Sequence, residues 1–251
     1  MMSPRAPFQS LILLFAFVVL APLSAWSQTT PPPNCGPIAQ PPPLATFGGP
    51  STAGAGQTEL GVAVGTYGEF YPSPSCGHVG TTDWMVRWRR GWGERLDLGF
   101  DGEVDTQGGT NGGTIKFAAR YAVTHGFRVE GGVGTSDTGF AGRSINADVA
   151  AVIGTTREDR TWNYYTSLRL AGSRGCNGLF CAGVDTAGYH NPGALVLLGA
   201  IGATARVSQH AEFVMEAADA EIFSRELPDP ERAGYVHFSI GILFKVGKRP
   251  T

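Results

Sequence analysis

The chain has 251 residues, 36 glycines and a formal net charge of −2. This balance lacks the strong basic excess of nucleic-acid-binding proteins, so we expect no nucleic-acid partner. After residue 27, no segment reaches the about 20 apolar residues that a membrane helix needs. The longest uncharged candidate, residues 193–205, is too short and is rich in glycine and alanine. A chain of this kind can enter a membrane only as a closed β-barrel.

The amino terminus has the three parts of a secretory signal peptide. Arg5 supplies a positive charge, residues 11–20 are uninterruptedly apolar, and small residues at Ala25 and Ser27 precede Gln28. We therefore expect residues 1–27 to be cleaved and the protein to be exported. The alternative is an uncleaved anchor, for which the apolar stretch is short. Small residues before Cys35 are missing, which argues against a lipid anchor.

Residues 28–56 contain two proline triplets followed by a run rich in glycine and alanine. Proline removes amide donors and favours extended backbone, and the small residues offer little to pack. This composition predicts a flexible arm and not a domain. A segment that fills a barrel lumen is the alternative.

From Gln57 onward, apolar and polar residues alternate with a period of two. Trp84, Val86 and Trp88, for example, alternate with Arg87 and Arg89. The pattern repeats about ten times up to residue 247, and a short polar tail occupies residues 248–251. It predicts β-strands with two different faces.

The connections between these expected strands alternate in length. Those after the second, fourth, sixth and eighth strands are short, and the remaining ones are longer, spanning 68–82, 105–113, 136–143, 172–192 and 223–234. This arrangement is typical of membrane barrels, with tight turns at one rim and long loops at the other. The sequence therefore predicts an all-β fold, a closed antiparallel up-and-down transmembrane β-barrel of about ten strands over residues 57–247. A soluble β-sandwich is the alternative.

On these features, residues 57–246 resemble the small single-chain outer-membrane β-barrel proteins of Gram-negative-type bacteria. The turn and strand at residues 92–99 (WGERLDLG) are similar to units of the MetA-pathway-like phenol degradation family of outer-membrane proteins. The last strand, with His237, Ile242 and Phe244, is similar to the assembly signal of such barrels, although Ser239 stands where glycine is usual. The resemblance implies location in the bacterial outer membrane, lipid contact, and insertion by the barrel-assembly machinery.

The polar face of the expected strands carries both charge signs. Buried ion pairs are the expected arrangement, because isolated charges in a lumen are costly. Anion selectivity from Arg87, Arg89 and Arg95 is the alternative. The lumen-facing candidates are Arg87, Arg89, Arg95, Asp97, Asp101, Lys116, Arg120, Arg128, Glu130, Asp148, Arg169, Arg206, Glu212, Glu216 and Lys245.

Four cysteines in an exported chain are disulfide candidates. Cys176 and Cys181 lie five residues apart in the longest expected loop. Cys35 and Cys76 would form the second pair, which would tether the arm inside the lumen as a plug. Two unpaired thiols, or an intermolecular bond of Cys35, are the alternatives.

The sequence shows no catalytic constellation, so we expect that the protein is not an enzyme and holds no cofactor or metal. His78 and His190 lie in different expected loops, with Asp83 and Asp185 only loosely near. The triplet at 237–239 superficially resembles the His-x-Ser of lipid A deacylase barrels, but the partner residues of that site are absent.

The expected role is passive. We predict passage of small or hydrophobic solutes, as in a porin-like transport protein, or a membrane-structural role. The alternative is surface recognition, as in an adhesin, by the long loops. The sequence predicts neither the identity of the solute nor the oligomeric state.

Overall fold

The computed structural model describes residues 46–70, 78–107, 110–137, 143–157, 161–175, 194–224 and 233–247. Ten β-strands run through these residues: β1 (Thr58–Phe70), β2 (His78–Gly91), β3 (Leu96–Gln107), β4 (Thr110–Thr124), β5 (Phe127–Asp137), β6 (Arg143–Gly154), β7 (Trp162–Gly175), β8 (Ala194–Arg206), β9 (Ala211–Ser224) and β10 (Ala233–Val246). Over the described residues, we find no helix with the length and apolar character needed to cross a membrane.

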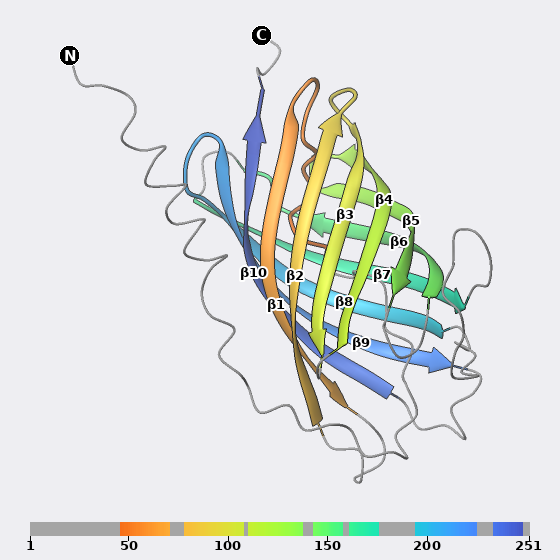
Figure 1. The fold of residues 1–251 in the computed structure, drawn as a ribbon. Helices are drawn as coiled ribbons and strands as arrows, with labels where there is room; N and C mark the ends of the chain where they lie inside the picture. Colours follow the sequence, from red (N-terminus) through yellow and green to blue (C-terminus); the bar gives the residue numbers. More distant parts are fainter. Residues whose placement is uncertain are drawn as a thin grey trace.

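Each strand pairs antiparallel with its neighbours in sequence, and the sheet closes on itself (Figure 1). The closing pair is β1 with β10, whose register runs from Thr58↔Val246 to Phe70↔Gly234. Closure leaves no unpaired strand edge. The prediction of a closed antiparallel up-and-down barrel of about ten strands is confirmed.

The barrel has two rims. We call the end with the connections after β2, β4, β6 and β8 the short-turn rim, which is the upper end in Figure 1, and the opposite end the long-loop rim. The strict alternation of connection lengths was wrong. Because β3 runs to Gln107 and β4 begins at Thr110, the expected long connection at 105–113 is mostly strand, while seven residues separate β6 from β7 at the short-turn rim.

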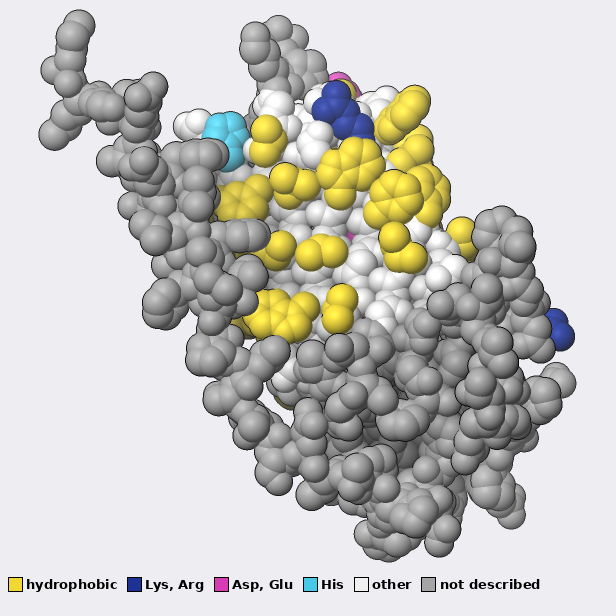
Figure 2. Space-filling view, in the orientation of Figure 1, with side chains coloured by type: hydrophobic (Ala, Val, Ile, Leu, Met, Phe, Trp, Pro, Cys, Tyr) yellow, Lys and Arg dark blue, Asp and Glu magenta, His cyan; other side chains and the backbone are white. Residues whose placement is uncertain are grey.

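The outer wall is apolar. Large hydrophobic side chains are exposed along every strand, for example Val86 at 59%, Val149 at 51% and Ile201 at 67%. Trp88, Phe100 and Phe117 pack side by side across β2, β3 and β4, with ring centroids 6.1 and 5.4 Å apart. Figure 2 shows hydrophobic side chains over much of the described outer surface.

The inner wall is largely polar and charged. Because successive side chains of a strand point to opposite faces, the residues that alternate with the apolar ones all point inward. The largest of these include Arg89, Arg120, Arg128 and Arg169, each less than 2% exposed. The interior is thus charged and tightly filled.

Candidate functional site: a peptide segment in the lumen

Residues 46–57, here called the luminal segment, lie inside the short-turn half of the barrel. The segment is held at the rim by backbone hydrogen bonds, from Gly56 N to Gly91 O at 3.2 Å and from Gly91 N to Gln57 O at 2.9 Å. From there it runs inward, with Ala53 N donating to Asp97 at 2.8 Å. At its inner end Thr46 Oγ1 lies 2.6 Å from Ser167 Oγ.

Besides Asp97, two side chains of the barrel wall accept hydrogen bonds from the segment's amides. Glu216 accepts from Thr46 N at 2.9 Å and from Phe47 N at 3.1 Å, one bond to each carboxylate oxygen. The Tyr165 hydroxyl donates to Glu216 Oε2 at 2.7 Å and accepts from Gly48 N at 3.3 Å. Glu216 thus receives three hydrogen bonds, two from amides of the segment and one from the barrel wall.

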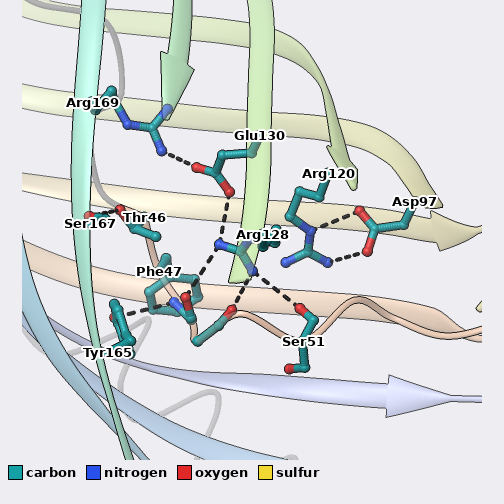
Figure 3. A network of polar contacts seen from close by, with 12 residues as sticks. Thr46, Phe47, Ser51, Asp97, Arg120, Arg128, Glu130, Tyr165, Ser167 and Arg169 are labelled. Atoms are coloured by element: carbon teal, nitrogen blue, oxygen red, sulfur yellow. Dashed lines mark hydrogen bonds and ion pairs between the residues drawn. The ribbon is translucent and has the colours of Figure 1, made fainter. Parts of the chain in front are cut away.

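Two arginines donate to the segment's carbonyl groups. Arg128 donates to Ser51 O at 3.2 Å, to Gly48 O at 3.4 Å and to Gly49 O, and Figure 3 shows its guanidinium between the segment and Glu130. Arg87 donates to Thr46 O at 3.0 Å and also to Phe47 O. The barrel therefore binds donors and acceptors of the same peptide backbone.

The Phe47 ring occupies a pocket lined by Ala63, Met85, Val214 and Leu243. The pocket exists because β1 and β10 present glycines there: a Cβ on Gly61 would lie 2.8 Å from the Phe47 ring, and one on Gly241 would lie 2.6 Å from it. The Arg87 guanidinium lies 5.5 Å from the ring centroid, in the range of a cation–π interaction.

Around the segment, the charged side chains of β1 to β7 form ion pairs, together called the ion-pair network here. Asp101 binds Arg87 at 2.9 Å, Arg89 and, at 3.8 Å, Lys116, and Lys116 in turn lies 2.6 Å from Asp148. The remaining pairs are Arg120 with Asp97 and Glu59, Arg169 with Asp148 and Glu130, and Arg128 with Glu130. Charges of both signs are paired with each other, as buried charges require.

Most of the lumen-facing candidates lie on the inner wall in the structure. The buried ones are Arg87, Arg89, Asp97, Asp101, Lys116, Arg120, Arg128, Glu130, Asp148, Arg169 and Glu216. Glu212 and Lys245 lie 3.6 Å apart and are partly exposed, and Arg206 is exposed at the end of β8. Arg95 departs from the expectation: β3 begins at Leu96, so Arg95 lies exposed in the turn and not on the inner wall.

Sequence reasoning missed several inner-wall residues. Glu59 precedes Leu60 in the alternating pattern, so its inward position could have been inferred from parity. The pairing of Asp83 with His237 could not have been inferred, because the two residues are 154 positions apart in the sequence. They lie on β2 and β10, which become the two neighbours of β1 only when the barrel closes.

The His237–Asp83 pair is a second polar cluster of the inner wall. His237 Nε2 lies 3.2 Å from both carboxylate oxygens of Asp83. Gly65 makes room for the pair, since a Cβ there would lie 2.3 Å from Asp83 Oδ1 and 2.4 Å from His237 Nε2. Ser239 also points inward and is buried. That the protein is not an enzyme stays a prediction.

The described residues contain no group of three or more His, Cys, Asp or Glu side chains arranged for a metal ion. The disulfide candidates Cys35, Cys76, Cys176 and Cys181, together with His190 and the expected signal peptide, lie outside the described residues.

Comparison with known proteins found no matching family model and no matching curated protein. Solved structures similar to the chain include Neisserial surface protein A, at 12% identity over 76% of this chain and 99% of the other, with a TM-score of 0.40. The β domain of the Bordetella autotransporter BrkA matches at 13% identity over 74% and 98%, with a TM-score of 0.41. The KdgM porin matches at 8% identity over 74% and 99%, with a TM-score of 0.37.

These likenesses concern the barrel fold alone. The resemblance to the MetA-pathway-like family stays a prediction.

Proposed function

We propose that this protein is an integral β-barrel of the bacterial outer membrane, closed in its described state by its own luminal segment, and that it passes small solutes when that segment is displaced. The observation that carries the proposal is the inverted distribution of polarity. Val86 and Ile201 are more than half exposed, while the charged Arg89 and Arg128 are almost completely buried. Such an outer wall is favourable against lipid and unfavourable against water.

The lumen supports a closed resting state. A barrel of about eight strands is just filled by its own side chains, whereas open channels appear at about sixteen strands. Ten strands leave a narrow interior, and here the luminal segment and the ion-pair network occupy it. Because the charged side chains of the described inner wall pair basic with acidic groups, we expect no selection for anions or cations there.

The proposal also implies a route of export and a location for the protein. Export by a cleaved signal peptide, insertion by the barrel-assembly machinery and contact with outer-membrane lipid are what a barrel of this type requires. Surface recognition by the long loops remains the alternative role, and those loops lie largely outside the described residues.

The test is single-channel conductance of the refolded mature protein in a planar bilayer, with and without reductant. Flotation with lipid vesicles checks insertion separately. We expect the wild type to be mostly closed and Phe47→Ala to open far more often, because the substitution empties the pocket that holds the segment. Phe100→Ala, which removes an aromatic ring from the outer wall, is the matched control. An inserted Phe47→Ala variant that stays silent would contradict solute passage.

A further inference from the structure

We infer that the short-turn half of the lumen is a binding site for a glycine-rich peptide, and that the luminal segment is its exchangeable resident ligand. The inference goes beyond the proposed passage of solutes, because it names a ligand class. It also holds if the barrel conducts nothing.

The barrel wall binds backbone groups of the luminal segment. Glu216, Tyr165 and Asp97 accept hydrogen bonds from the amides of residues 46, 47, 48 and 53. Arg87 and Arg128 donate to the carbonyls of residues 46, 47, 48, 49 and 51. These contacts do not depend on the side chains of the bound segment, so another peptide in the same direction can make them.

The luminal segment is separable from the barrel. Among the described residues, no strand pairs with residues 46–53, and the backbone bonds of the segment to the barrel lie at the rim, around Gly56 and Gln57. The ten-strand ladder closes through β1 and β10 without the segment. The segment can therefore leave without breaking a strand pair.

An empty site would be unfavourable. Without the segment, Arg128 keeps Glu130 and Arg87 keeps Asp101, but both lose their carbonyl partners, and Glu216 loses two amide donors. Buried charged groups that lose hydrogen-bond partners are costly. A peptide supplies donors and acceptors together, which a simple anion or cation does not.

The site also has a sequence preference, for an aromatic residue followed by glycine. The pocket formed at Gly61 and Gly241 takes the ring of Phe47. Gly48 has a φ of +125°, a conformation open to glycine, and a Cβ there would lie 3.2 Å from Leu243. At Gly49 no positive φ is needed, and a Cβ would make an ordinary contact 3.9 Å from Tyr165.

The experiment begins with the full-length mature protein carrying a protease recognition sequence inserted after Gly56, which is exposed at the rim. The protein is folded in detergent first and then cut, under reductant, so that any disulfide to Cys35 is open. Retention of the cut segment is followed by gel filtration. A fluorescent synthetic peptide of residues 44–56 is then added, and its binding is measured by anisotropy with unlabelled competitor peptides.

We expect the cut segment to stay bound and to exchange with the labelled peptide. The wild-type and Gly49→Ala peptides should compete equally, whereas the Phe47→Ala and Gly48→Ala peptides should compete at least about tenfold less well, a difference of about 1.4 kcal/mol. Because the changes are in the synthetic peptides, the barrel itself is not altered. Immediate loss of the cut segment with no rebinding overturns the inference, as does equal competition by all four peptides or a segment that never exchanges.

Discussion

Gly61 of β1 and Phe47 of the luminal segment fit against each other, since a Cβ on Gly61 would stand 2.8 Å from Phe47 Cε1. The same Cβ would lie 2.7 Å from Leu243 Cδ2, a side chain of the same pocket. The glycine in the strand therefore creates the space that an aromatic residue in the segment fills. The barrel wall and the segment are complementary in shape at this point. Neither the sequence of the strand nor that of the segment reveals this fit by itself.

We predict that Gly61→Ala loosens the luminal segment. Overpacking a filled pocket costs about 1–3 kcal/mol, so cleavage by a protease specific for aromatic residues at Phe47 should become roughly tenfold faster or more. The measurement is the cleavage rate of the folded protein in detergent. Gly199→Ala is the control, because a Cβ at Gly199 meets nothing within 4 Å. Equal cleavage rates in the two variants would count against the fit.

Arg87 should help to hold the luminal segment in the lumen. Arg87 is buried, donates to two carbonyls of the segment and binds Asp101 at 2.9 Å. We expect Arg87→Gln to raise the open fraction in bilayer recordings, since the segment loses part of its hydrogen bonding. Arg95→Gln should leave it unchanged, because Arg95 lies exposed in the β2–β3 turn. A larger effect at Arg95 would mean that surface charge, and not the segment, controls passage.

Buried and rim ion pairs should differ in their contribution to stability. Asp148 pairs with Lys116 at 2.6 Å and with Arg169, and all three side chains are at most 3% exposed. Breaking a buried pair costs about 3–5 kcal/mol, so Asp148→Asn should strongly lower the free energy of unfolding in urea. Glu212→Gln removes the partly exposed pair with Lys245, which is worth at most about 1 kcal/mol. Equal losses would show that water reaches Asp148 freely.

The alternating pattern was sufficient to predict which way each strand residue points. Trp88 lies outside and Arg89 inside because side chains one position apart point to opposite faces. Glu59 obeys the same rule. Strand ends were harder to place, as Arg95 shows, because alternation continues into a turn and no residue there marks where pairing stops.

Contacts between residues distant in sequence could not be derived from the pattern. Composition alone suggested an arm of 28 to 56, since glycine and alanine offer few packing side chains. The backbone of Gly48 and Gly49 is nevertheless held by Arg128, about 80 positions away. Hydrogen bonds to backbone groups do not depend on the residue type of the segment. Composition therefore cannot distinguish a flexible arm from a segment that fills the lumen.

A charged substitution on the outer wall should affect a membrane barrel and a soluble barrel differently. Val149, near the middle of β6, and Val207, beside the short-turn rim, are both exposed, at 51% and 69%. In lipid, an arginine at the midplane costs about 2–4 kcal/mol, and one near the interface costs about 0–1 kcal/mol. Val149→Arg should therefore reduce folding yield and stability in lipid vesicles, while Val207→Arg should have little effect. In a water-soluble barrel both substitutions would be surface changes within about 0.5 kcal/mol. Equal, small effects at the two positions would place water, and not lipid, against the outer wall.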